Sequence, residues 1–120
     1  MGNRVLLNQD NIIVIEVVGD QTPASVELMG RQTDLLLTEL KTLGKPGLIL
    51  DDLMQIGAVG ADARKVVVEL GEWLDYDKLA MLGKGGIMKL GANLMLRATG
   101  RSYKLRYFDD RQKAINWLQA

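Results

Sequence analysis

The sequence contains no cysteine and no histidine, and its only serines are Ser25 and Ser102. These absences exclude Ser-His-Asp and Cys-His catalytic sites, and they exclude zinc sites of the usual Cys/His kind. Disulfides are excluded as well, which fits a reducing compartment. An enzyme made from this chain would depend on carboxylates, lysine, tyrosine or backbone amides, so we expect a protein that is not an enzyme.

Long apolar runs are also missing from the chain. No stretch approaches the roughly 18 residues that a membrane span requires, and the first residues lack the pattern of a signal peptide. A length of 120 residues and a content of 25% charged residues are typical of a globular domain. We expect a single domain over residues 1–120. We therefore expect a soluble, cytoplasmic protein without a transmembrane segment.

Basic residues are in the minority in the first part of the chain, and acidic residues are scarce in the last part. Residues 1–77 contain 6 Lys/Arg and 13 Asp/Glu, whereas residues 78–120 contain 9 Lys/Arg and 2 Asp/Glu. The basic half could attract an anionic partner, or the two halves could neutralise one another in the fold, and the second interpretation is favoured. Because the isoelectric point is near 6.2, we expect no nucleic-acid binding.

Hydrophobic periodicity predicts an α/β fold with the order β-β-α-β-α-β-α-β-α. Five strands are expected at residues 4–8, 12–18, 48–50, 79–82 and 103–108. About four helices are expected. The first is capped by Thr22 and ends at Gly44, and two more cover residues 61–76 and 86–98. The last is capped by Asp109 or Asp110. Asp109 and Gln112 could form a capping box there. This alternation favours a single domain with a mixed, mostly parallel five-stranded sheet whose first strand is an antiparallel edge.

Two aspartates follow the third apolar run, at the place where open α/β sheets bind ligands. The prediction is that the strand stops at Asp51 and Asp52 and that a glycine-alanine loop follows over residues 57–60. The carboxylates could bind a divalent cation or a polar ligand, or they could simply end the strand and solvate the loop. With no third carboxylate beside them the second interpretation is favoured, so neither a metal nor a cofactor is expected.

A glycine-rich turn follows the fourth predicted strand, with the residues Gly83, Lys84, Gly85 and Gly86. Amide groups at a helix N-terminus attract anions, and Lys84 would add positive charge. The turn matches neither dinucleotide-binding nor P-loop spacing, so a tight turn is the favoured interpretation. Together with Asp51 and Asp52, these residues form the hypothetical ligand- or anion-binding site.

The third predicted helix is apolar over more than one face, through Met88, Leu94, Met95 and Leu96 beside Arg97. A helix of this kind is usually buried on two sides, and methionine-rich surfaces suit adaptable binding. Its second side could pack in the core, or it could meet a second copy of the chain, a protein partner, a lipid-like molecule or a membrane surface. We expect a homodimer that uses this interaction surface.

The segment RYFDDRQKAINWL, residues 106–118, combines a strand ending in aromatics with a capped helix and a tryptophan. This segment and the order of elements resemble the SpoIIAA-like proteins, relatives of the STAS domain of anti-sigma-factor antagonists with a looser tie to the lipid-binding Sec14 domain. The resemblance implies a small domain of βα turns that acts in regulation rather than catalysis.

Anti-sigma-factor antagonists carry a phosphorylatable serine in a motif after the third strand, and the resemblance places that motif at residues 57–60. The closing glycine is present, but no Ser or Thr occurs between Leu43 and Thr99, so the phosphorylation switch cannot operate in this segment. The resemblance therefore implies a non-catalytic regulatory or interaction module that lacks this serine. The alternative is a binder or sensor of a lipid-like or other small apolar or anionic ligand. A small enzyme using Asp51, Asp52 and Lys84 is a weaker alternative.

Overall fold

The chain folds as an α/β domain in a computed structural model that describes residues 2–85 and 104–120. The elements follow one another as β1 (Arg4–Leu7), β2 (Ile12–Gln21), α1 (Pro23–Thr42), β3 (Leu48–Val59), α2 (Ala61–Trp73), β4 (Lys78–Leu82), β5 (Leu105–Phe108) and α4 (Arg111–Gln119). The predicted fold class is confirmed. The described part contains three helices, and the helix expected over residues 86–98 lies outside it.

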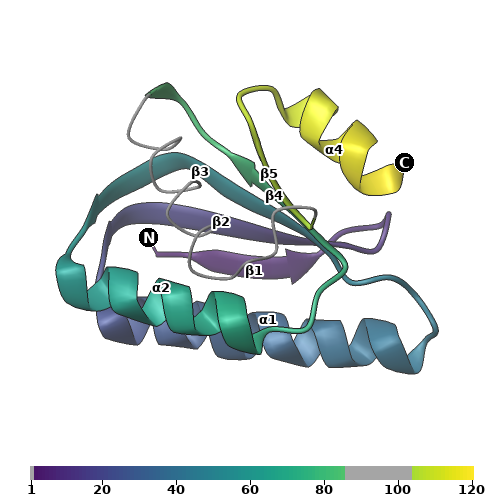
Figure 1. Cartoon of the computed structure of the whole chain (residues 1–120), viewed down its shortest axis with the longest axis horizontal. Helices are drawn as coiled ribbons and strands as arrows, with labels where there is room; N and C mark the ends of the chain where they lie inside the picture. The colour runs from purple at the N-terminus through teal and green to yellow at the C-terminus, as the bar shows by residue number, and fades with distance from the viewer. Residues whose placement is uncertain (1, 86–103) are drawn as a thin grey trace.

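The five strands form one sheet in the order β1-β2-β3-β4-β5. β1 pairs antiparallel with β2, and every other neighbouring pair is parallel, so the expected antiparallel edge is confirmed. Figure 1 shows α1 and α2 together on one face of the sheet and α4 on the other. None of the helices within residues 2–85 and 104–120 is long and apolar enough to cross a membrane.

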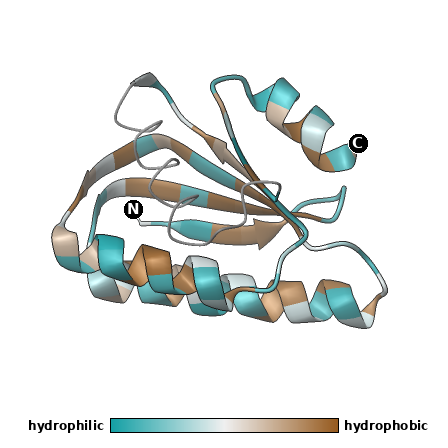
Figure 2. Cartoon of the chain, viewed as in Figure 1, coloured by the Kyte–Doolittle hydropathy of each residue, from teal (hydrophilic) through white to brown (hydrophobic). Residues whose placement is uncertain are grey.

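Alternation along the strands divides the interior into two separate cores. On β2, Ile13, Ile15 and Val17 join the core under α1 and α2, whereas Ile12 and Val14 join the core under α4. Figure 2 shows hydrophobic residues concentrated on the strands, while the helices alternate hydrophobic and polar positions, as helices that cover one face of a sheet do.

Two of the three described helices, α1 and α4, begin with a residue whose side chain caps the helix. Thr22 and Ser25 form a capping box, with each side chain accepting a hydrogen bond from the other's backbone amide, at 3.1 and 2.9 Å. Asp110 caps α4, and its Oδ1 accepts a hydrogen bond from the Lys113 amide at 3.0 Å. The predicted box of Asp109 with Gln112 is wrong by one residue, because Asp110 occupies the cap position.

The main error of the sequence prediction concerns β3. The strand does not stop at Asp51 but continues to Val59, and residues 57–59 belong to it rather than to a loop. Pairing explains the continuation: Asp51 and Asp52 are aligned between β2 and β4, and the later residues stay paired with β2 across two register shifts. Asp20 also holds this end of the strand, because its Oδ1 accepts a hydrogen bond from the Ala58 amide at 2.8 Å.

Candidate functional site

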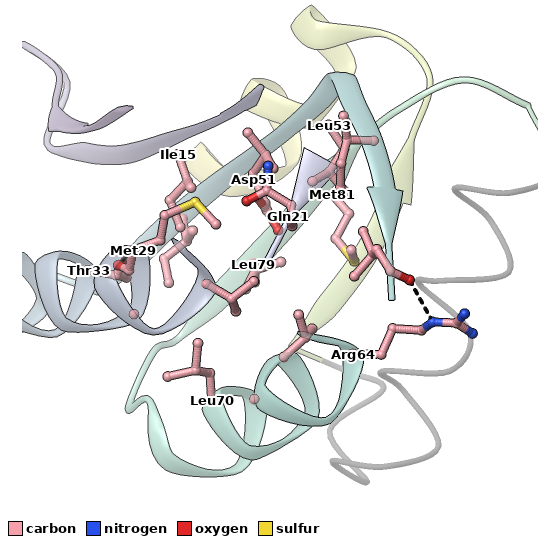
Figure 3. A pocket seen from close by; sticks show the side chains of 18 of the residues that line it. Ile15, Gln21, Met29, Thr33, Asp51, Leu53, Arg64, Leu70, Leu79 and Met81 are labelled. Atoms are coloured by element: carbon pink, nitrogen blue, oxygen red, sulfur yellow. Dashed lines mark hydrogen bonds between the residues drawn. The ribbon is translucent and has the colours of Figure 1, made fainter. Parts of the chain in front are cut away.

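A pocket of about 910 Å³ opens between the sheet and the helices α1 and α2. Its lining is mostly apolar and comes from β2, β3 and β4 on one side and from the two helices on the other (Figure 3). The inner lining residues are buried, and the residues with exposed side chains at the opening include Met54, Arg64 and Lys84. A volume and lining of this kind are typical of small-molecule binding sites.

Asp51 is the one acidic residue among the described residues that line this pocket. It lies on the central strand, directly between Ile15 of β2 and Met81 of β4. Ile49 and Leu53, two positions away on the same strand face, are buried beside it. Asp51 is half-buried, with buried apolar neighbours on all four sides. The exposed part of its side chain therefore faces the pocket (Figure 3).

This environment raises the pKa of Asp51 to about 7 from its ordinary value of 3.8. The main cause is burial, which disfavours the charged carboxylate, and the nearby charge of Asp52 adds to it. Within residues 2–85 and 104–120, no group forms a hydrogen bond or an ion pair with the Asp51 carboxyl that would stabilise its charged form. The carboxyl therefore changes its protonation state near neutral pH.

Two other buried polar residues of the pocket have their hydrogen bonds satisfied within the chain. The Gln21 amide donates to the Gly19 carbonyl at 2.9 Å, and its oxygen accepts from Asn3 Nδ2 at 2.8 Å. The Thr33 hydroxyl donates to the Met29 carbonyl at 2.8 Å. These side chains can contribute shape to the pocket, but their strongest polar contacts are already made.

Asp52, the second aspartate of the hypothetical site, lies on the opposite face of the sheet. Adjacent residues of a strand point to opposite faces, so Asp51 faces α1 and α2 while Asp52 faces α4. There Asp52 Oδ2 lies 3.0 Å from Arg111 Nη1, and Asp52 Oδ1 accepts a hydrogen bond from the Met54 amide at 3.0 Å. The two carboxylates therefore do not converge on a common ligand.

The glycine-rich turn after β4 is tied to β5. The Gly83 amide donates to the Phe108 carbonyl at 3.0 Å, and the Gly83 carbonyl accepts from the Tyr107 hydroxyl at 2.9 Å. Gly85 has a φ of 74°, which favours glycine, and Lys84 is exposed beside the pocket. Gly83 is thus used structurally, so among the described residues of this turn the anion-site hypothesis depends on Lys84 and Gly85.

Several predicted site residues lie outside the described residues. They are Gly86 of the turn and the residues of the expected interaction surface, Met88, Leu94, Met95, Leu96 and Arg97. In the parts of the chain that the structure describes, no three potential metal-ligating side chains come together.

A comparison with protein-family models matched the SpoIIAA-like family over residues 12–119. The chain belongs to this family. Its SpoIIAA-like fold is also seen in a crystal structure of an uncharacterised protein of the DUF3478 family from Shewanella loihica PV-4, described as having a SpoIIAA-like fold. That protein is 22% identical, with a TM-score of 0.67 over 98% of this chain and 92% of the other, so the similarity concerns the fold. A search of curated proteins found no match.

Residues 57–60, where the resemblance to the antagonists places their phosphorylated motif, form the end of β3 and the start of α2. Gly60 is the N-cap of α2 and makes no side-chain hydrogen bond there. Neither the pocket nor the role of Gln21, Thr33 and Arg64 in its lining was predicted from the sequence. The available signal was the period of two along β3, which would have separated the two aspartates had the strand been continued past them.

Proposed function

We propose that this SpoIIAA-like protein is a non-catalytic binder or sensor of a small apolar molecule, which it holds in the pocket between the sheet and helices α1 and α2. The observation that carries the proposal is the pocket itself, about 910 Å³ in volume and lined mainly by apolar side chains. Burial of apolar ligand surface is the main favourable contribution to binding in such a site.

The shape of the lining supports a ligand that enters at one end. Ile49, Tyr76 and Leu79 are buried and form the inner part of the lining. Arg64 and Lys84 are exposed, and Arg64 Nε donates to the Val59 carbonyl at 3.0 Å, which fixes its stem at the rim. An apolar body inside and polar groups at the opening suit an amphipathic molecule.

Binding of Nile red, a neutral dye that fluoresces in apolar surroundings, tests this proposal. Val67 lines the pocket from α2, so Val67→Phe places extra volume inside it. We expect this variant to weaken dye binding by about tenfold, equivalent to about 1.4 kcal/mol. Native mass spectrometry of the purified protein would in addition detect a bound molecule as added mass.

Val66→Phe is the matched control, because Val66 is also half-buried on α2 but does not line the pocket. We expect it to bind the dye as the unchanged protein does, and urea unfolding checks that both variants are folded. Equal dye binding by the unchanged protein and folded Val67→Phe would refute the proposal.

The regulatory role and the homodimer remain proposals beside this one. Membership of the SpoIIAA-like family supports a regulatory module, and a bound ligand is an input that does not need the missing serine. The interaction surface around Met95 and Leu96 lies outside the described residues, so a measurement of mass in solution is the direct test of the dimer.

A further inference from the structure

The chemistry of the ligand can be inferred further, on the basis of the proposed ligand-binding function. We propose that the pocket binds an amphipathic amine, with its apolar body among the lining side chains and its ammonium group paired with the Asp51 carboxylate.

Asp51 occupies a position where an apolar residue is expected. It is on the central strand of the sheet, with Ile15 and Met81 beside it on the neighbouring strands. An apolar side chain at this place would extend the core without cost, whereas a carboxyl group loses hydration there. A carboxyl group kept at the centre of an apolar pocket is therefore best explained by a ligand group that pairs with it.

The required partner does not come from the part of the chain that the structure describes. Over residues 2–85 and 104–120, the Asp51 carboxyl has no hydrogen bond and no ion pair. Gln21 and Thr33, the buried polar residues of the pocket lining, have their hydrogen bonds to other groups. A donor from the ligand would complete this site.

An ammonium group matches the site better than a neutral donor does. Hydrogen bonds between charged partners are about twice as strong as those between neutral groups. A paired cation also offsets the cost of burying the carboxylate, which an alcohol cannot do. The ligand class is therefore an apolar body with one amino group.

Other titratable groups line the same pocket and must be weighed. Arg64 on α2 and Lys84 after β4 are exposed cations, Tyr76 follows α2, and α1 and β2 contribute no titratable residue to the lining. Asp52 is close in sequence but lies on the other sheet face, paired with Arg111. The two cations are screened by solvent at the opening and would favour an anionic ligand, so a carboxylate of equal length is the strongest rival.

The experiment compares octylamine, octanol and octanoate as competitors of Nile red. The three probes share one chain length and differ in the polar group. We expect octylamine to bind the unchanged protein about tenfold more tightly than octanol or octanoate at about pH 8. We expect Asp51→Asn, which keeps the shape of the side chain, to remove this preference while retaining the dye.

The preference should also depend on pH with a defined sign. Because the pKa of Asp51 is about 7, the carboxylate dominates at higher pH and the neutral acid at lower pH. An alkylammonium ion stays protonated up to about pH 10.4, so the amine itself does not titrate in this range. Octylamine affinity should therefore fall about tenfold from about pH 8 to about pH 6, and octanol affinity should not change.

Asp52→Asn is the matched control, since it removes an adjacent carboxylate that faces away from the pocket. It should keep the preference for octylamine. Equal affinities of the three probes, a preference for octanoate, or a preference that persists in Asp51→Asn would each overturn the amine proposal. If Nile red binds while any of these outcomes is found, the proposed ligand-binding function stands and only the amine proposal fails. If neither the dye nor the probes bind, both the ligand-binding function and the amine proposal fail.

Discussion

Arg111 Nη1 lies 3.0 Å from Asp52 Oδ2, and this ion pair connects the C-terminal helix α4 to the central strand β3 over a separation of 59 residues. The same carboxylate accepts a hydrogen bond from the Met54 amide. Asp52 therefore has a structural role on one face of the sheet, while its neighbour Asp51 faces the pocket on the other.

A double-mutant cycle on Asp52 and Arg111 measures this ion pair. Because the Arg111 side chain is 50% exposed, solvent screens the pair, and we expect a coupling free energy of about 0.5–1 kcal/mol. The variants are Asp52→Asn, Arg111→Gln and their combination, compared by urea unfolding. The coupling should decrease in 1 M salt; a value of zero at low salt would mean that the pair does not hold α4.

Asp51→Asn should stabilise the protein at alkaline pH in the absence of ligand. Because burial raises the pKa of Asp51 from 3.8 to about 7, the folded state retains a proton that the unfolded chain loses. The contribution of Asp51 to the free energy of unfolding of the unchanged protein therefore falls as pH rises from about 4 to about 7. We expect the substitution to raise the free energy of unfolding by about 1–3 kcal/mol at pH 8, less than the full shift gives because the carboxyl faces the pocket.

Urea unfolding at pH 8 and at pH 4.5 tests this dependence. At the lower pH, Asp51 is neutral in the folded state, so the advantage of asparagine should nearly disappear. Asp52→Asn serves as the control: it removes the smaller cause of the raised pKa of Asp51 but also loses the ion pair with Arg111, so its effect at pH 8 should stay well below that of Asp51→Asn. The same gain from Asp51→Asn at both pH values would contradict a buried, titrating carboxyl.

Thr22→Ala should destabilise the protein through loss of the capping box of α1. The Thr22 hydroxyl accepts a hydrogen bond from the Ser25 amide at 3.1 Å, and alanine cannot replace it. We expect a loss of about 1 kcal/mol in the free energy of unfolding. Thr22→Ser, which keeps the hydroxyl, should remain close to the unchanged protein, and an equal loss in both variants would argue against capping as the cause.

Lys78→Met should weaken the attachment of the last helix. The Lys78 ammonium group donates to the Trp117 carbonyl at 2.9 Å and the Ala120 carbonyl at 3.1 Å, and it lies 5.3 Å from the centroid of the Trp117 ring. Loss of these contacts at a helix C-terminus should cost about 1–2 kcal/mol in thermal or urea unfolding. Lys113→Met removes the same charge from an exposed position of α4 and should have little effect.

The order of elements could be predicted because strands and helices carry different hydrophobic periods. The capped start of α1 at Thr22 and the antiparallel first strand were also predicted correctly, the cap because threonine is a preferred N-cap residue. The length of β3 could not be predicted, since aspartate and glycine disfavour strands and only pairing with β2 and β4 keeps Asp51 within one.

The pocket is harder to predict than the strands because it depends on tertiary packing. Its size is set by how α1 and α2 lie on the sheet, and at Gly30 a β-carbon would overlap the Leu70 side chain of the other helix. No local pattern encodes this approach. Asp51 was a candidate from the sequence, but it was expected to share a site with Asp52 at the end of a strand. In the structure the two side chains lie on opposite faces of the sheet.

The division of the interior into two cores has a consequence for local unfolding. Among residues 2–85 and 104–120, the core under α4 contains seven buried residues, Ile12, Val14, Leu50, Ala80, Leu82, Ala114 and Leu118, whereas the core under α1 and α2 is larger. Detaching α4 exposes only the smaller core and leaves the other face of the sheet packed. Amide hydrogen exchange should therefore show α4 opening as a separate unit, at lower free energy than α1.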